Sequence, residues 1–517
     1  MSPVCPVVGL VLGDQLSEWP QVVDRADPSL PILMIEAPGE SRHVPSHKAR
    51  TTLFLSAMRH AAQRWAAQGL RLHYLSLLDP HFRSVDGLGE RLGRWLTEHR
   101  VQRLVCVETG DLRLTREIEA ACESCGVTLD WRTDAHFLVS RSEFEAWAMG
   151  RKQLRLEHFY RQMRRQHRVL VDDQGEPQGG RWNFDQENRA AFGRAGPGEL
   201  PRPIRFAPDA LTREVMAEVE QVFAQHPGSL ADFGWPVTPE EAKAALEDFI
   251  EHRLSGFGAH QDAMWTDMWF GWHALLSSSL NLHLLDPRWA IERAQRAYEE
   301  GAADLASVEG FIRQILGWRE FIRGVYWLEM PELARANALG ADRDLPPWFW
   351  TGQTQMVCQA QVIGQTLQTG YAHHIQRLMV TGLFGLLAEV RPAALSDWFH
   401  AVYVDAVDWV ERPNVVGMAL YANAGRFTSK PYLASGAYID KMSNYCGRCR
   451  YNPRLRTGPA ACPMTSLYWR FLLRHESLLR ANPRTGLMAK QAQRLSPSER
   501  EAIWAWTDAL LDQPQLL

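Results

Sequence analysis

The sequence predicts a chain of two folded parts, an α/β domain built on a parallel sheet followed by an all-α domain. The chain has 517 residues, too many for one hydrophobic core. Its first 135 residues alternate short apolar runs with amphipathic stretches, whereas helical periodicity dominates from about residue 210. We therefore expect an α/β domain over residues 1–135, a linker with a basic helix over 136–209, and an all-helical domain over 210–517.

The strands of the first domain are expected in five apolar runs, which read "VVGLVLG", "PILMIEA", "LRLHYLSL", "VQRLVCVE" and "VTLDWRTD". Strands that alternate with helices form a parallel sheet with both faces covered. Ligands of such sheets bind at the carboxyl ends of the strands, and "GDQL" (13–16) follows the first run. No G-x-G-x-x-G follows it, which argues against a Rossmann-type nucleotide site.

The linker contains "GRKQLRLEHFYRQMRRQHR", which has seven Lys or Arg and one Glu. Arg161, Arg164, Arg165 and Arg168 have the spacing of one helix face. A solvated face is the preferred interpretation, and contact with a phosphate backbone is the alternative. The Pro-rich segment 196–209 is expected to cross between the two domains.

Composition is that of an ordinary globular protein. The net charge of -4 gives no general sign of nucleic-acid binding, so a basic surface has to be local. The stretch 268–285 has no formal charge but contains polar side chains, and it is a poor membrane span. The amino terminus has no basic export signal, and we expect a cytoplasmic monomer.

Residues 346–376 contain no charged side chain but seven glutamines. A polar, uncharged helix of that length suits an interior that surrounds a large polar ligand. The 20 tryptophans of the chain have two interpretations, an aromatic core or a stacking and electron-relay surface for an aromatic cofactor.

Three cysteines lie close together in "NYCGRCRYNPRLRTGPAACP" (444–463). Cys446 and Cys449 form a C-x2-C pair, Cys462 follows, and Cys358 is the candidate fourth ligand. Four thiolates suit structural zinc or an iron–sulfur cluster, and the spacing leaves both open. A second pair, Cys122 and Cys125, is interpreted as buried thiols.

Positive charge surrounds this cysteine site. Residues 441–475 contain seven Lys or Arg and no acidic residue, among them Arg448, Arg450, Arg454 and Arg456. These cations could compensate a negatively charged cluster or contact DNA phosphates.

Polar side chains also gather in three helical stretches. Gln314 and Arg319 lie in "SVEGFIRQILGWREFIRGVYW", and "GYAHHIQRLMV" holds His373, His374 and Arg377. His374 and Arg377 are three residues apart and share a face. The third stretch, "VDAVDWVERPNVVGM", adds two aspartates, a glutamate and an asparagine, namely Asp405, Asp408, Glu411 and Asn414.

Four motifs together resemble the photolyase/cryptochrome superfamily. They are "FIRQILGWREFIRG", "YAHHIQRLMVTGLF", "DAVDWVERPNVVGM" and "KPYLASGAYIDKMSNYCGRCRYNP". The resemblance is to its bacterial iron–sulfur branch, whose members include (6-4) photolyases. It spans the chain from "LGDQL" to "ACPMTSLYWRFL" and is strong.

The resemblance implies the photolyase/cryptochrome fold, with an antenna domain and a helical domain that holds FAD. It assigns Cys358, Cys446, Cys449 and Cys462 to a 4Fe-4S cluster. Arg377 is expected to pair with Asp408 beside the flavin ring. The remaining flavin contacts that it implies are Ser277, Ser278, Asn281, Gln314, Arg319, Asp405, Asp408 and Asn414.

The implied activity is light-dependent repair of UV-damaged DNA, with electron transfer from photoexcited reduced FAD to a (6-4) pyrimidine photoproduct. His374 matches the family's proton donor, with His373 beside it. The lesion would be flipped out of the duplex to reach the flavin. Eukaryotic (6-4) enzymes have a second histidine four residues later, where this chain has Leu378.

The branch is also associated with an antenna pigment, 6,7-dimethyl-8-ribityllumazine, for which the matching positions are Asp14, Ile35, Glu40 and Phe54. A role in turns or caps is the alternative for the two acidic residues. Trp350 and Trp398 match the electron relay. The next residue, Phe399, stands where a redox-active tyrosine is expected.

Other interpretations stay open at this stage. A cryptochrome-like photoreceptor would keep flavin, cluster and relay but repair no DNA. A cyclobutane-dimer photolyase shares nearly all the motifs, and only His374 argues against it. A structural-zinc DNA-binding protein would hold no flavin.

Overall fold

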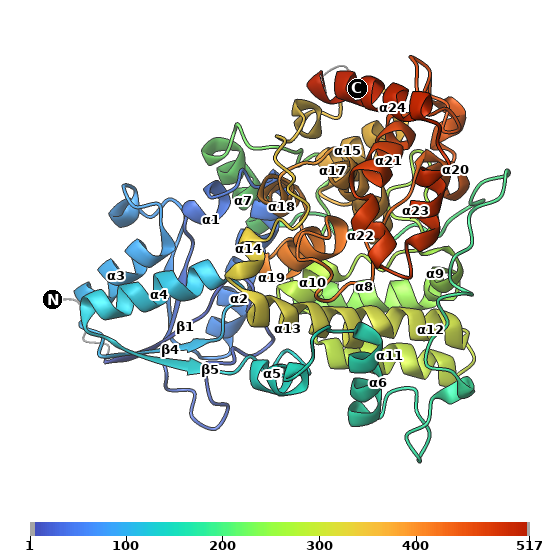
Figure 1. Cartoon of the computed structure of the whole chain (residues 1–517). Helices are drawn as coiled ribbons and strands as arrows, with labels where there is room; N and C mark the ends of the chain where they lie inside the picture. The colour runs from blue at the N-terminus through green and yellow to red at the C-terminus, as the bar shows by residue number, and fades with distance from the viewer. Residues whose placement is uncertain (1–5, 514–516) are drawn as a thin grey trace.

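The computed structural model describes residues 6–513 and residue 517. Five strands form one parallel sheet in the order β3-β2-β1-β4-β5 (Figure 1). Each of the five predicted apolar runs contains one of these strands, so the parallel sheet is confirmed. The strands are β1 (Val7–Leu10), β2 (Ile32–Ile35), β3 (Leu72–Leu75), β4 (Arg103–Val107) and β5 (Thr128–Arg132).

Helices cover both faces of this sheet. On one face, α3 (Leu88–Glu98) and α4 (Leu112–Cys125) pack on apolar strand residues such as Leu10 and Leu33 and enclose a small separate core. On the other face, α2 (Lys48–Ala67) packs on Ile32 and Met34, which belong to the main core of the protein. Through this second face the sheet shares the main core with the helical part. A single turn, α1 (Gly39–Arg42), follows β2.

The segment after the sheet forms α5 (Arg141–Ala148) and α6 (Leu156–His167). The prediction that four arginines share one solvated face of this basic helix is wrong. Arg164 is fully buried and donates hydrogen bonds to the carbonyl oxygens of Val169, Leu170 and Trp182. Arg168 lies beyond the helix, because it adopts a left-handed conformation (φ 55°) and caps α6. The buried arginine thus holds the loop that follows.

Residues 210–513 contain no strand, as predicted for the second domain. Its first half packs against the sheet domain and the basic segment (Figure 1). The helices of this half are α7 (Ala210–Val222), α8 (Pro239–His252), α9 (Leu254–His260), α10 (Ser277–Asn281), α11 (Pro287–Glu299), α12 (Leu305–Ile312), α13 (Glu320–Glu329) and α14 (Glu332–Arg335).

The uncharged stretch 346–376 does not form the single long helix expected. A 3-10 turn at Pro347–Trp350 precedes α15 (Val357–Thr369), and Gly370 ends this helix in a left-handed conformation (φ 73°). The single turn α16 (His374–Gln376) then begins a new direction. The break places His373 and His374 at a helix start.

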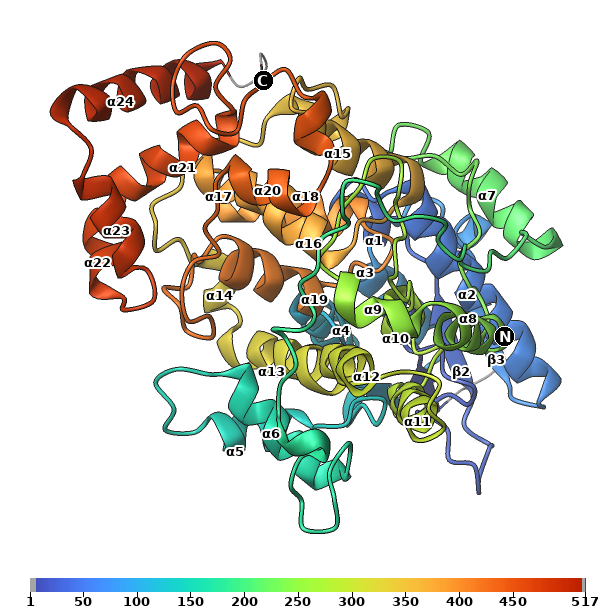
Figure 2. The same ribbon diagram turned by 90° about the vertical axis from the view of Figure 1, so that its right-hand side faces the viewer.

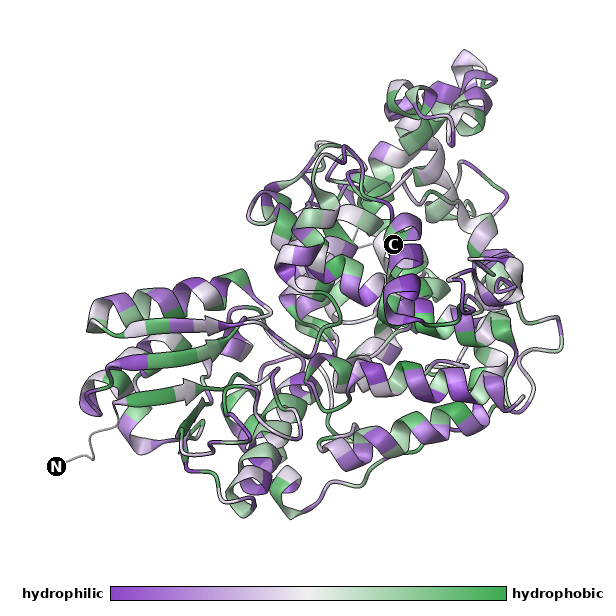
Figure 3. Ribbon diagram, turned by 90° about the horizontal axis from the view of Figure 1, so that it is seen from below, coloured by the Kyte–Doolittle hydropathy of each residue, from purple (hydrophilic) through white to green (hydrophobic). Residues whose placement is uncertain are grey.

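The last helices begin next to the sheet domain, where His400 contacts Arg50 of α2, and those from residue 463 onward gather at the end of the molecule away from the sheet (Figure 2). They are α17 (Leu383–Leu387), α18 (Pro392–Val402), α19 (Asp408–Arg412), α20 (Gly436–Met442), α21 (Pro463–Arg474), α22 (Glu476–Ala481), α23 (Gly486–Gln493) and α24 (Pro497–Asp512). Colouring by hydropathy shows largely apolar strands and outer helices with polar stripes (Figure 3). Among the described residues, no helix is long and apolar enough to cross a membrane.

Candidate functional site

Three π-helical segments interrupt the helices of the described chain, and each carries predicted flavin contacts. They are Arg313–Arg319, Arg377–Gly382 and Pro413–Ala419. The last two contact each other, and α13 contacts the first and the third. A π-turn inserts an extra residue into a helix and is found mostly at functional sites. The flavin-type residues therefore come from irregular helical turns that meet in one region.

Arg377 is the centre of this region. Its guanidinium contacts both carboxylate oxygens of Asp405 at 3.0 Å and the carboxylate of Glu411 at 3.2 Å. Its Nε donates to the carbonyl oxygen of Ala372 at 2.7 Å. A planar guanidinium held by three groups has a defined orientation.

The expected pair between Arg377 and Asp408 is therefore wrong. Asp408 accepts hydrogen bonds from Arg412 at 2.9 Å and from the Tyr326 hydroxyl at 2.6 Å. Burial opposes its ionisation, but hydrogen bonding from His400 and the charge of Arg412 keep the pKa of Asp408 well below its usual range. The extended backbone at Val407, just before α19, separates the two aspartates.

Glu411 is a neighbour of Arg377 that the sequence did not assign to the site. Burial, with the charge of Asp405 adding to it, raises the pKa of Glu411 to about 8, although Arg377 opposes the shift. Glu411 is therefore mostly protonated at pH 7. A protonated carboxyl group can donate a hydrogen bond to a ligand.

Helix α10 brings the predicted serine and asparagine contacts to the same aspartate. Ser277 donates to the Asp405 carboxylate at 2.6 Å, and Asn281 donates to the Asp405 carbonyl oxygen at 2.8 Å. The buried hydroxyls of Ser278 and Ser279 have no hydrogen-bond partner. Buried polar groups are nearly always paired, so these hydroxyls suit a polar ligand such as FAD.

The remaining predicted flavin residues make bonds close by. Gln314 and Asn414 donate to the carbonyl oxygens four residues before them, at 3.0 and 2.8 Å. Arg319 donates to Glu320 at 2.9 Å, while its buried Nε has no partner. A ligand with phosphate groups could engage this nitrogen and the Gln314 amide, which is exposed.

His373 and His374 differ sharply in their surroundings. His373 is 1% exposed, and neither of its ring nitrogens has a partner. The His374 side chain is exposed, yet the protein around it and the charge of Arg377 lower the pKa of its imidazole to about 4. His374 is thus the accessible imidazole, and it is neutral at pH 7 in the protein alone.

The four predicted cluster cysteines come from three separate elements. Cys358 lies in α15, Cys446 lies in the turn at 445–448 with Cys449 at its end, and Cys462 caps α21. Burial, followed by the charges of the other three thiols, raises the pKa of Cys358 well above its usual value. The four thiols are therefore neighbours, although no three His, Cys, Asp or Glu side chains in the described chain could hold a single metal ion as they lie.

The arginines near these cysteines are of two kinds. Arg450 bonds to the Gln355 side chain, and Arg456 contacts Glu499 at 3.2 Å and lies 4.2 Å from the Trp469 ring. The side chains of Arg448 and Arg454 are exposed. The latter two are placed to meet an external anion.

Elsewhere, Cys122 is buried and half-buried Cys125 donates to the Gly93 carbonyl oxygen at 3.3 Å.

All four predicted antenna residues line one cavity at the carboxyl ends of the strands. It encloses about 840 Å³ of space, part of it open to solvent, and we call it the sheet-edge cavity. Asp14, Ile35, Glu40 and Phe54 come from the sheet domain, and His400, Val407 and Asp408 close it from the helical domain. The site therefore lies where strand ends of a parallel sheet predict it, and it also involves the second domain.

Most charges in the sheet-edge cavity are paired within it. Arg113 contacts Glu40 at 2.8 Å and Asp111 at 3.2 Å. Arg50 is a donor only, so His400 accepts its hydrogen bond at 3.1 Å through Nε2. Burial, followed by the charge of Asp134, raises the pKa of Asp14 to about 7. The sequence missed the lining residues His43, Arg50, Asp111, Arg113 and His400.

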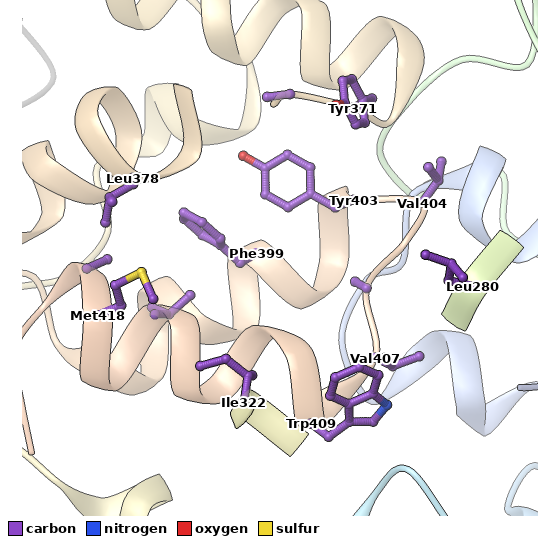
Figure 4. Packing of buried hydrophobic residues seen from close by; sticks show 14 of the residues in the cluster. Leu280, Ile322, Tyr371, Leu378, Phe399, Tyr403, Val404, Val407, Trp409 and Met418 are labelled. Atoms are coloured by element: carbon purple, nitrogen blue, oxygen red, sulfur yellow. The ribbon is translucent and has the colours of Figure 1, made fainter. Parts of the chain in front are cut away.

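The predicted relay tryptophans are at opposite levels of burial. Trp398 is 1% exposed and Trp350 is 38% exposed. Phe399 packs against Tyr403, with ring centroids 5.3 Å apart, and Tyr403 is 6.0 Å from Trp398 (Figure 4). The ring of Tyr403 also lies 3.7 Å from the Arg377 guanidinium carbon. Tyr403, four residues later in the chain, thus places a tyrosine ring beside Phe399.

Comparison with known proteins gives the family. The model of the deoxyribodipyrimidine photo-lyase-related protein family matches residues 9–235. The (6-4) photolyase of Agrobacterium fabrum is 43% identical over 507 residues, which cover 97% of this chain and 98% of that protein.

Solved structures share the fold at low identity. A bacterial class III photolyase from Agrobacterium tumefaciens has a TM-score of 0.55 and 14% identity, covering 92% of this chain and 98% of the other. A cryptochrome from Synechocystis sp. PCC6803 has a TM-score of 0.54 and 14% identity, covering 86% and 89%. The fold prediction is confirmed, and the chain belongs to the photolyase/cryptochrome superfamily, in the bacterial branch that contains the (6-4) photolyase of Agrobacterium fabrum.

Proposed function

We propose that the chain is a light-dependent DNA repair enzyme that reverses (6-4) pyrimidine photoproducts. The observation that carries the proposal is His374, an exposed imidazole one helical turn before the fixed guanidinium of Arg377. The near-full-length identity to a (6-4) photolyase supports it. A cyclobutane dimer needs no proton donor at this position, whereas reversal of a (6-4) product has to return an oxygen atom to its original base.

FAD is the cofactor for which the helical domain is suited. When bound, it supplies the light-driven electron that splits the lesion. Ser277 and Asn281 both donate hydrogen bonds to Asp405, and the three residues would fix one side of the site. Arg377 would orient the ligand beside it, and protonated Glu411 could donate a hydrogen bond to that ligand. The remaining predicted contacts are Ser278, Gln314, Arg319 and Asn414.

His374 would hold the proton that assists transfer of the oxygen. In the protein alone the pKa of this imidazole is about 4, because the surrounding protein atoms and the charge of Arg377 disfavour its charged form. Negative charge from DNA phosphates and from an anionic ligand on Arg377 would raise this pKa. His374 therefore becomes an effective acid only when DNA and the ligand are bound, and it stays unprotonated in the free protein.

Two further groups complete the proposal. A 4Fe-4S cluster on Cys358, Cys446, Cys449 and Cys462 would tie the carboxyl-terminal segment to α15, the helix that precedes the histidines. The sheet-edge cavity would hold 6,7-dimethyl-8-ribityllumazine, whose ribityl hydroxyls suit Asp14 and Glu40.

Trp350 and Trp398 would serve photoreduction, and we propose a cytoplasmic monomer that acts on UV-damaged DNA.

The test uses two duplexes, one with a single (6-4) product and one with a single cyclobutane dimer, under blue light. We expect conversion of the first to intact thymines and no conversion of the second. Conversion of the cyclobutane dimer alone would replace the proposal by the second type of photolyase. Tight lesion binding without any conversion, or equal binding of intact DNA, would favour a photoreceptor instead.

A further inference from the structure

A third histidine reaches the proposed proton donor from a distant part of the sequence. His273 lies in the tryptophan-rich segment just before α10, one hundred residues before His373. The imidazole rings of His273 and His373 are stacked, with centroids 4.3 Å apart and planes inclined by 13°. His374 follows His373 directly in the chain, so three imidazoles occupy one region.

The stacked pair leaves polar nitrogens without partners inside the protein. Both ring nitrogens of buried His373 are unpaired, and so are Nε2 of His273 and Nε1 of Trp272. Such groups are rare in folded proteins and mark places where a ligand is expected. Leu378, four residues after His374, cannot pair with these nitrogens, because its side chain is apolar and buried.

Electrostatics separates the roles of the three rings. Two imidazolium groups stacked face to face would repel each other, and the charge of Arg377 also disfavours a charged His373. The pKa of His373 is held well below its usual value by burial first, then by His273, His374 and Arg377. Burial, followed by the charge of His374, lowers the pKa of His273 to about 3. The exposed His374 is therefore the member on which a proton is most stable.

We propose that His273 is a positioning residue for the proton donor: by stacking on His373 it fixes that ring, keeps the stacked pair uncharged, and so confines the proton to His374. This inference rests on the proposed function. His273 itself does not touch the substrate in this arrangement. It acts through His373, whose backbone leads directly into the catalytic imidazole.

Two variants of His273 test whether a ring stacked on His373 is what repair requires. His273→Phe keeps a flat, permanently neutral ring on His373, whereas His273→Ala removes it. The control is His260→Phe, at the end of α9, because the His260 ring stacks on Phe192 and Trp272, with ring centroids 4.9 and 6.4 Å away, and not on His373. Binding of the (6-4) duplex in the dark and the rate of a single repair turnover are measured for each.

We expect His273→Ala to slow repair about tenfold while dark binding stays unchanged, a loss that places the effect in the reacting complex. His273→Phe should restore most of the rate, and His260→Phe should match wild type. A wild-type rate in His273→Ala, a Phe variant as slow as Ala, or parallel loss of binding and rate would overturn the inference.

A spectroscopic measurement tests the stack without repair. In protein with isotope-labelled histidine, the His373 ring resonance is identified by its absence in His373→Asn. Wild type and His273→Phe should show a ring-current shift of this resonance, and His273→Ala should lose it. An unshifted resonance in wild type would overturn the inference. An inactive wild type with the stack intact would overturn the proposed function alone.

Discussion

The two polar sites of the molecule satisfy their side chains in opposite ways. In the sheet-edge cavity, charges neutralise one another, as in the contacts of Arg113 with Glu40 and Asp111. None of the residues that line this cavity has a buried side-chain nitrogen or oxygen without a partner. In the helical domain, the hydroxyls of Ser278 and Ser279 and the ring nitrogens of His373 are buried and unpaired.

This difference indicates different dependence on ligands. A cavity whose polar groups are already paired can fold and persist without its pigment, so an antenna there would be an accessory. Unpaired buried groups destabilise the protein until a ligand pairs them. We therefore expect the flavin to be bound tightly and to stabilise the fold, and the antenna pigment to be lost easily.

The largest stability effect should follow loss of the central cation. Arg377→Met leaves the buried carboxyl groups of Asp405 and Glu411 without their partner, and breaking such a buried pair costs about 3–5 kcal/mol. We expect little flavin in the purified variant, measured as the ratio of flavin to protein absorbance, and a lower melting temperature.

A matched variant in the other site sharpens the comparison. Arg113→Met removes a cation whose side chain is 33% exposed, so we expect a loss of only about 1 kcal/mol and normal flavin content. If both variants lose the same stability, the distinction between the two sites is wrong.

The sheet-edge cavity should affect repair only when light is scarce. Asp14→Leu places an apolar group where a carboxyl group with a raised pKa lies, so pigment should be lost. We expect a repair rate several-fold lower than that of wild type in weak light and equal to it in saturating light. A lower rate in saturating light would mean that the cavity serves the reaction itself.

The dependence of stability on pH has opposite signs for Glu411 and for the histidines. Buried Glu411 keeps its proton up to about pH 8, while an unfolded chain loses it near pH 4. Stability from this group therefore falls as pH rises from about 4 to 8. Glu411→Gln should remove this decline, so its melting temperature relative to wild type should be higher at pH 8.5 than at pH 5.

Histidines contribute in the other direction. Burial, with positive neighbours such as Arg50 and Arg377, lowers the pKa of both His400 and His374 to about 4, so the unfolded chain binds more protons between pH 4 and 6.5. Through buried His400, acid should destabilise the protein by up to about 1.4 kcal/mol per pH unit in this range. Thermal melts of His400→Gln across this range should show a shallower loss than wild type.

Sequence patterns predicted features that local rules determine. The five strands, the cavity at their carboxyl ends and the separation into sheet and helical parts follow from periodicity and from the geometry of parallel sheets. The resemblance supplied the residues of the flavin region. The resemblance did not predict which aspartate pairs with Arg377. Asp405 and Asp408 are only three residues apart, but the extended backbone at Val407 places them in different sites.

Features that depend on distant contacts were missed. Charge spacing could not reveal that Arg164 is used to hold a loop, since its partners are backbone carbonyls. His273 and Tyr403 reach the site from segments whose sequences carry no local sign of it. Glu411 was visible as an acidic residue, but only its contact with Arg377 gives it a role.

The central claim is that His374 supplies the proton for repair of a (6-4) photoproduct. The most direct measurement is single-turnover repair of a (6-4) duplex by flavin-loaded His374→Asn, with dark binding of the same duplex as control. A missing general acid costs about 100-fold or more, so the account predicts a loss of that size with binding unchanged. Repair at the wild-type rate would contradict it.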